Sequence, residues 1–238
     1  MANNLTAEAV HEQLLSLANP EIAEHSQRFF KTGAGEYGEG DQFLGIRVPV
    51  LRQQVTRYQK LPNDELIRLL QSPFHEERLF ALLIWVKQFQ TGSEKEQAHL
   101  YDLYLRHTQF INNWDLVDSS AYQIVGAFLE RKDRQPIYPL AQSQSLWERR
   151  IAMMATFQWI RNHDFEDALA IAKLLLHDKE DLIHKAVGWM LREIGKRDLE
   201  TEKAFLKAHY QEMPRTMLRY AIEKFPQSER QRYLKGLV

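Results

Sequence analysis

Apolar residues recur at helical spacing along most of the chain. In DFEDALAIAKLLLH (164–177) and RTMLRYAIEKF (215–225) they follow the i, i+3, i+4, i+7 pattern, which places one stripe of a helix against a core. NDELIRLLQS and EKEQAHLYDLYLRH add cap signals, because Asn63 and Ser93 each come directly before acidic residues. Strict alternation of apolar and polar residues is scarce. The pattern therefore predicts an all-α fold.

A weak repeat underlies these helices. Arg78 in EERLFALLIW and Arg150 in ERRIAMMATF are 72 residues apart, with position 114 midway between them. Lys185 in IHKAVGWMLRE follows Arg150 by 35 residues, and Arg219 comes 34 residues later. A recurrence of this length, with two helices in each unit, is typical of a HEAT-like α-solenoid. The alternative is a chance echo between helices of an ordinary all-α protein.

A polar loop at residues 32–45 interrupts the N-terminal part and holds five of the ten glycines. Gly33, Gly35 and Gly38 match G-x-G-x-x-G, a fingerprint that binds dinucleotides only between a strand and the start of a helix. No apolar, β-branched strand precedes these glycines, so we do not expect a nucleotide site. We predict a structured connector into FLGIRVP, with Pro49 near the start of the next helix.

Composition narrows the class of protein. The chain has 238 residues, 44% of them hydrophobic, and a net charge of -1, which suits one large globular domain or two small ones. We predict a single repeat domain over residues 1–238. Cysteine is absent, which excludes disulfides and thiolate sites and is consistent with a cytoplasmic protein. The start, MANNLTAEAVHEQLLSLANP, lacks the features of a secretory signal. No apolar run approaches the ~18 residues of a membrane span, so we expect no membrane partner.

Candidate chemistry rests on carboxylates, arginines and aromatic rings. The nine histidines form no metal-ligand spacing, and neither a nucleophile elbow nor a phosphate-binding loop is present, so we expect no metal and no cofactor. In FINNWDLVDSSAYQIVGAF, Trp114 and Asp118 are four residues apart and share one face of a helix. Asp115 points ~100° away from Trp114, where it would cap a helix or pair with a neighbouring basic residue. For Asp118 alone, a local salt bridge is the alternative.

Trp189, behind Gly188 in KAVGWMLRE, stands at the equivalent helix two repeats later. Glycine there allows a backbone or a ligand to approach closely, although a core tryptophan is the alternative. Trp147 and Trp159 resemble packing residues. In a solenoid, equivalent helices line one concave surface, so Trp114, Asp118, Arg150 and Trp189 would converge there. Two indoles and a carboxylate suit a cationic ring, and an arginine suits a phosphate.

These segments resemble the AlkD-like DNA alkylation repair proteins, a family of HEAT-like-repeat DNA glycosylases. The resemblance runs from about Phe29 to Phe225 and is carried by FLGIRVP, NNWDLVDSSA, WERRIAMM and KAVGWMLREIGK. It implies a right-handed α-solenoid that acts as a monomer on double-stranded DNA, in the cytoplasm and at the nucleoid. It also implies removal of N-alkylated, cationic purines such as 3-methyladenine and 7-methylguanine.

The resemblance also assigns roles. Asp118 matches the catalytic aspartate, Trp114 and Trp189 match two aromatic residues that contact the lesion, and Arg150 matches an arginine that holds the DNA. Phe30 falls near a family tyrosine. The implied enzyme is monofunctional: the aspartate stabilises an oxocarbenium-like state and positions water, and the base stays stacked instead of being extruded into a pocket.

Positive charge for the phosphates would come from a basic rim. Residues 201–238 hold eight Lys and Arg against four Glu, and Arg149, Arg150, Lys185 and Arg192 would join them. A solvated charged face is the alternative. Two other functions stay open: a non-catalytic repeat protein that binds damaged or branched DNA, and a solenoid that binds proteins.

Overall fold

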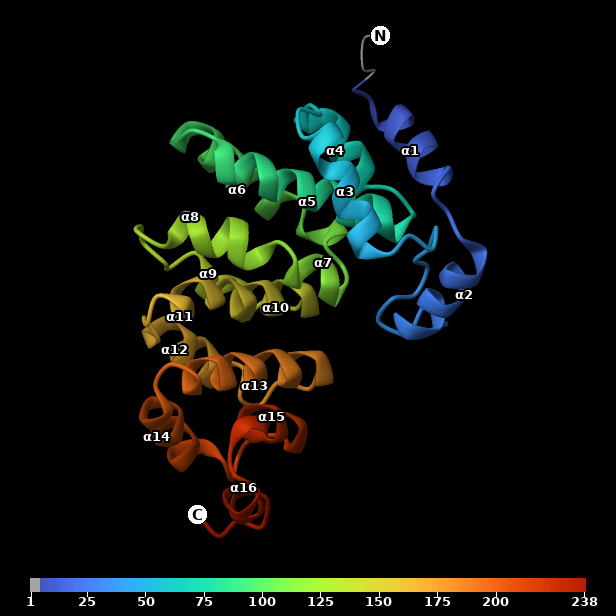
Figure 1. Ribbon diagram of the computed structural model, residues 1–238. Coiled ribbons are helices and arrows are strands. Elements are labelled where there is room, and N and C mark those ends of the chain that lie inside the picture. Colours follow the sequence, from blue (N-terminus) through green and yellow to red (C-terminus); the bar gives the residue numbers. More distant parts are fainter. Residues whose placement is uncertain (1–4) are drawn as a thin grey trace. The chain divides into compact units, whose positions relative to one another are not determined.

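The computed structural model describes residues 5–238 (Figure 1), and these fall into two compact units that divide between Ser120 and Ala121. The all-α prediction is confirmed, because the described residues form helices and a single isolated bridge, Gln42 to Phe74, in place of any sheet. The single-domain range 1–238 stays a prediction. Its first four residues, which also begin the stretch judged to lack a signal, lie outside the described part.

The first unit is built around one buried helix. Helix α5 contacts α3, α4, α6 and α7, and it is buried on almost every side along its first three turns. The helices of this unit are α1 (Ala7–Leu15), α2 (Pro20–Phe29), α3 (Val48–Tyr58), α4 (Asn63–Leu70), α5 (His75–Thr91), α6 (Glu94–Arg106) and α7 (Trp114–Asp118), with a 3-10 turn at Thr108–Phe110.

Helix starts in the first unit follow the sequence signals with one exception. Ser93 and Glu96 form a complete capping box at the start of α6, as the sequence predicts. Pro49 lies in the first turn of α3, also as predicted. The prediction that Asn63 caps α4 is wrong, because Asn63 is the first residue of the helix and its side chain makes no capping hydrogen bond. Its side-chain oxygen instead accepts the indole N–H of buried Trp85 at 3.0 Å, so a tertiary contact takes the place of the cap.

The glycine-rich loop is an ordered connector, as predicted, and the element before it is helix α2 instead of a strand. Glu76, at the start of α5, is buried and accepts the backbone N–H groups of Leu44, Gly45 and Ile46 at 2.8 to 3.1 Å. Gly45 has φ +79°, and a Cβ there would lie 2.0 Å from the carbonyl oxygen of Asn19. The loop therefore requires glycine at this position.

The second unit stacks helices in sequence order. Helix α10 contacts α9, α12 and α13, and α13 contacts α14 and α15, so each helix pair packs on the next (Figure 1). The helices are α8 (Ala127–Leu129), α9 (Ile137–Ala141), α10 (Leu146–Ala155), α11 (Phe157–Arg161), α12 (Glu166–Leu174), α13 (Asp181–Gly195), α14 (Leu199–His209), α15 (Arg215–Ala221) and α16 (Gln227–Leu234), with a 3-10 turn at Ile222–Lys224.

A π-helical turn, η2 (Tyr122–Gly126), leads into α8. The last residue of η2, Gly126, lies against α10 and α11, because a Cβ there would be 2.2 Å from the carbonyl oxygen of Ala155. The Gly126 carbonyl accepts the indole N–H of Trp159 at 2.9 Å. Trp159 is only 1% exposed, which confirms that it is a packing residue.

The positions that carry the sequence repeat fall at equivalent places in the helices. Arg78, Trp114, Arg150, Lys185 and Arg219 all lie within the first five residues of α5, α7, α10, α13 and α15. The recurrence therefore marks the starts of helices that recur along the chain with other helices between them, which supports a repeat architecture over a chance echo.

Gly188 serves helix packing. A Cβ at this position would lie 2.4 Å from the carbonyl oxygen of Met217 and 2.5 Å from the Cβ of Tyr220, both on α15. Of the two expectations for Gly188, the close approach of a backbone is the one observed. No helix among residues 5–238 combines the length and the apolar character needed to cross a membrane.

Candidate functional site

Helix α7 carries two of the predicted site residues. Trp114 is its first residue and Asp118 its last, so the predicted spacing of four falls within one helix and puts both on one face. Both side chains are half-buried. Asp118 also acts on its surroundings: burial raises the pKa of Tyr104, and the negative charge of Asp118 raises it further. The Tyr104 hydroxyl lies 2.9 Å from that of Ser120, whose O–H is directed to the Leu116 carbonyl.

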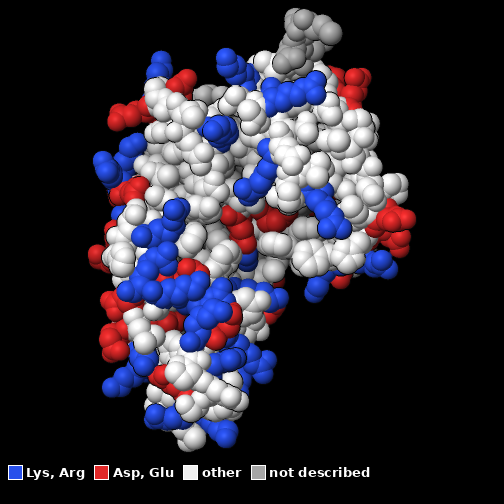
Figure 2. All heavy atoms as spheres, in the orientation of Figure 1, with Lys and Arg blue, Asp and Glu red and all other residues white. Residues whose placement is uncertain are grey.

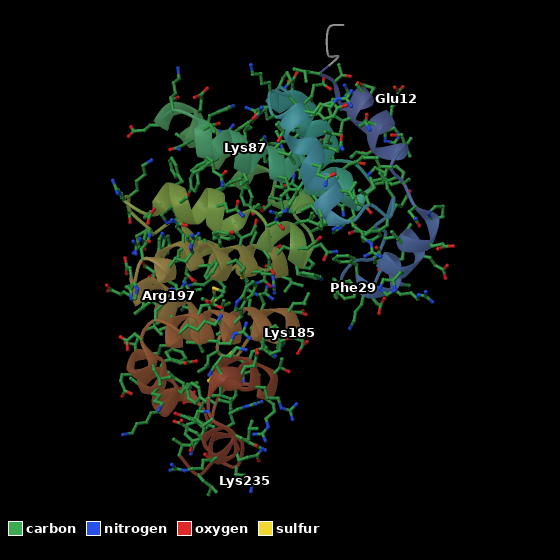
Figure 3. The ribbon with its side chains drawn as sticks, in the orientation of Figure 1. Glu12, Phe29, Lys87, Lys185, Arg197 and Lys235 are labelled. Carbon is green, nitrogen blue, oxygen red and sulfur yellow. The ribbon has the colours of Figure 1, made fainter. Side chains whose placement is uncertain are left out.

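The Trp114 indole is the outer member of an aromatic stack. Its ring lies on Phe30, with centroids 5.3 Å apart and planes 18° from parallel. Phe30 stacks in turn on Phe43 at 5.1 Å, and Phe43 stacks on the His75 imidazole at 4.7 Å. Phe29 meets the edge of Trp114 at 6.0 Å, is 58% exposed, and projects from the end of α2 in Figure 3. The inner rings of the stack, Phe43 and His75, are buried, and the outer ring, Trp114, lies toward the surface.

A buried charge cluster lies behind this stack. His75 places Nε2 2.8 Å from Oδ2 of Asp115 and Nδ1 3.2 Å from Oδ2 of Asp41. Asp41 also pairs with Arg78, at 2.6 Å between Nη2 and Oδ1, and accepts a hydrogen bond from the Asn113 amide at 3.3 Å. The expectation that Asp115 pairs with a neighbouring basic residue is confirmed, and that residue is His75.

The cluster favours its charged forms. Burial alone would lower the pKa of His75, but Asp115 and Asp41 outweigh it and raise that pKa to about 9. Burial would likewise raise the pKa of Asp41, yet the His75 hydrogen bond and the Arg78 charge hold it below its ordinary value. Two cations and two carboxylates therefore balance in a site where His75, Asp41 and Arg78 are each less than 10% exposed.

In the second unit, Trp189 is half-buried on α13. Its indole N–H donates to Oε1 of Glu193 at 3.2 Å. Its ring lies 6.3 Å from that of Phe157, which meets Tyr122 edge-on at 5.3 Å. Burial would raise the pKa of Glu193, but hydrogen bonds from Lys196, Arg197 and the indole hold it low. Trp189 thus has an orienting partner, Glu193, and an aromatic neighbour, Phe157.

The adjacent arginines of α10 differ in setting. Arg150 is 4% exposed, and its Nη1 donates to the Leu182 carbonyl at 2.5 Å. Arg149 holds Asp178 through Nε at 2.6 Å and donates through Nη1 to two backbone carbonyls. The Leu182 bond ties α10 to α13, and the Asp178 bond ties it to the segment before α13. The two carbonyls that Arg149 contacts, those of Ser143 and Gln144, belong to the turn before α10 itself. Contact of either arginine with DNA stays a prediction.

Lys185 and Arg192 both lie on α13. Lys185 is half-exposed and pairs with Asp181 at 2.7 Å, while Arg192 pairs with Glu223. Arg192 also lowers the pKa of buried Glu202, which burial raises to about 8. Figure 3 labels Lys185, in the first half of α13, and Arg197, which lies just beyond the other end of this helix. Lys and Arg crowd the visible face of the second unit with Asp and Glu among them (Figure 2), so its positive charge is partly neutralised locally.

Sequence reasoning missed several members of these clusters. His75 and Asp41 lie in different segments, and no spacing connects either of them to Asp115. Phe157, which contacts Trp189, and Tyr122, which contacts Phe157, belong to no sequence motif. Among residues 5–238, no three His, Asp or Glu side chains are arranged to hold a metal ion.

Comparisons with a protein-family model and with solved structures both point to DNA alkylation repair proteins. Residues 10–225 match a protein-family model described as DNA alkylation repair enzyme. No curated protein sequence matches the chain. A solved structure described as a predicted DNA alkylation repair enzyme from Enterococcus faecalis aligns with a TM-score of 0.65 at 17% identity, covering 88% of this chain and 97% of that one. AlkD2 from Streptococcus mutans aligns with a TM-score of 0.54 at 17% identity, covering 87% and 98%. At this identity, the two structures establish a common fold.

Proposed function

Because the chain belongs to the DNA alkylation repair enzyme family, we propose that it is a DNA glycosylase that removes N-alkylated, cationic purines from duplex DNA. The observation that carries the proposal is the pairing of Trp114 and Asp118 on one face of α7. An indole face attracts a cationic base, and a fixed carboxylate stabilises positive charge that develops on the sugar.

In the proposed mechanism the alkylated purine leaves as a neutral base, so no strong general acid is needed. As the glycosidic bond breaks, the electron pair goes to the purine and positive charge grows on the deoxyribose. Asp118 stabilises this charge and orients the water that attacks the anomeric carbon. As the new C–O bond forms, the water loses one proton, which passes to solvent. No lysine forms a covalent intermediate, so the product is an abasic site in an intact strand. No step uses a cofactor.

We assign supporting roles to the second unit. Trp189, oriented by Glu193, contacts the lesion-bearing nucleotide. Lys185, half-exposed at one end of α13, contacts phosphate, and Arg149 and Arg192 contribute charge. Because Arg150 is buried and bonded to the Leu182 carbonyl, it acts best by holding α10 and α13 in position for DNA. The protein works as a monomer in the cytoplasm and at the nucleoid.

The test is base release from methylated duplex DNA, measured by chromatography of the freed 7-methylguanine. We expect the wild-type protein to release the base and Asp118→Asn to lower the rate by on the order of a hundredfold or more, as loss of one transition-state contact does. Gel-shift binding should persist in this variant. Asp102→Asn, on the exposed face of α6, is the matched control and should behave as wild type.

Equal release by wild type and Asp118→Asn would show that the catalytic assignment is wrong. Binding of linear or branched duplexes without any release would select the non-catalytic DNA-binding function. Absence of both would favour a protein scaffold.

A further inference from the structure

His75 faces an acceptor at each ring nitrogen. Asp115 Oδ2 lies 2.8 Å from Nε2, and Asp41 Oδ2 lies 3.2 Å from Nδ1. A neutral imidazole has one N–H and one lone pair, so it would turn a lone pair toward a carboxylate oxygen on one side. Only the imidazolium donates in both directions. The contacts therefore describe a buried cation shared by two carboxylates.

Among the described residues, this cation is the hydrogen-bond partner of the Asp115 carboxylate. The other oxygen of Asp115, Oδ1, is buried and makes no hydrogen bond there. If His75 lost its proton, one carboxylate contact would become repulsive, and Asp115 has no second partner to compensate. Leaving a buried charge without its partner is strongly destabilising.

Helix α7 depends on that connection. It spans one turn, Trp114–Asp118, and a helix this short is not stable by itself in water. Its N-cap, Asn113, donates to Asp41, and its second residue, Asp115, is held by His75. The same imidazole forms the base of the stack that runs through Phe43 and Phe30 to Trp114. His75 therefore supports Trp114 in two ways: it holds the backbone of α7 through Asp115, and it supports the indole ring through Phe43 and Phe30.

Building on the proposed function, in which Trp114 meets the damaged nucleotide, we propose that His75 is a positioning residue whose imidazolium locks α7 and holds Trp114 flat on Phe30. Loss of the proton releases Trp114 from this position. His75 touches neither substrate nor reacting atoms and acts through Asp115 and the aromatic stack.

The direction of the pH effect follows from the groups around the ring. Asp41 faces it from the loop, Asp115 from α7 and Arg78 from α5, while Glu76 is occupied by loop amides. The folded-state pKa of His75 is about 9, above its ordinary value of 6.5. The contacts of the His75 imidazolium that hold α7 are therefore complete below pH 6.5 and are lost as pH rises through about 9.

The test follows two resonances across a pH titration of the full-length protein: the ring Cε1–H of His75 and the indole N–H of Trp114, the latter identified by its loss in Trp114→Phe. We expect both to move together near pH 9 in the wild type. In Asp115→Asn both should move at lower pH, since Asp115 raises the pKa of His75, and acidification to about pH 5.5 should restore the wild-type Trp114 signal. Asp102→Asn should leave both titrations unchanged.

A Trp114 signal that stays constant while His75 titrates would overturn the proposal, as would a His75 ring that is neutral at about pH 7. If base release is observed, Asp115→Asn should lower kcat about ten- to a hundredfold at about pH 8, with a smaller change in KM. The resonances need no substrate, so coupled titration without any base release would refute the glycosylase and leave the lock intact.

Discussion

Glu76 shows how much one buried carboxylate organises. It is 4% exposed and accepts three consecutive backbone N–H groups from the loop that precedes α3. Without it, these donors would be buried with no acceptor, because the loop has no strand partner along Leu44–Ile46. A side chain of α5 therefore does for the loop what a neighbouring strand does in a sheet.

Replacing Glu76 by alanine should destabilise the first unit severely. Each orphaned buried N–H costs about 1–3 kcal/mol, so the free energy of unfolding should fall by at least about 3 kcal/mol. Urea titration monitored by circular dichroism measures this change. Glu12→Ala, at an exposed position of α1 (Figure 3), is the control and should shift the free energy by less than about 0.5 kcal/mol. Equal effects of the two substitutions would contradict the role of Glu76.

At the same scale, sequence predicted local relations well and distant ones poorly. The spacing of Trp114 and Asp118 and the pairing of Asp115 with a base depend on helix geometry, which the sequence encodes directly. The identity of that base, His75, depends on which turns meet in the fold. Forty positions separate the two, and no periodicity links them.

At the level of elements, helix starts were the most predictable feature, because capping is a local interaction. The capping box of Ser93 is present, whereas Asn63 shows how tertiary contacts override such a signal. Glycines illustrate a similar limit. Sequence indicates that Gly188 permits close approach, but only the structure identifies α15 as the neighbour that approaches.

Gly188→Ala should therefore weaken the second unit, although alanine is the better helix former. The added methyl group would meet the Met217 carbonyl and the Tyr220 side chain at less than 3 Å and force α13 and α15 apart. Overpacking of this kind costs about 1–3 kcal/mol, measurable as a lower urea midpoint. Gly33→Ala is the control, since its nearest neighbour is the flexible end of Glu36. A Gly188 variant as stable as wild type would contradict the packing.

At the scale of the whole molecule, positive and negative charges nearly cancel in number, but Lys and Arg are concentrated on the visible face of the second unit (Figure 2). The net charge of -1 provides no general attraction to a polyanion. Binding of DNA would depend on a few exposed cations, and many others already pair with carboxylates in their own unit. We therefore expect a shallow dependence of DNA affinity on salt.

Lys185→Gln tests this expectation. If Lys185 contacts one phosphate, its replacement should reduce the slope of log affinity against log salt by about one, because about one fewer counterion is released. Fluorescence anisotropy with a labelled duplex measures the slope. Lys87→Gln, on α5, is the matched control, and both lysines are labelled in Figure 3. Identical slopes for Lys185→Gln and wild type would remove Lys185 from the interface.

The π-helical turn at Tyr122–Gly126 affects how this chain is to be aligned with its relatives. Such a turn closes over one residue more than an α-helical turn, as a single inserted codon would leave it. Against a relative whose helix is regular at this point, a gap-free alignment puts one flank out of step by one residue. Either Trp114 and Asp118 or Arg150 would then be matched to the wrong column, so transfer of residue roles across this family requires a gap inside the turn.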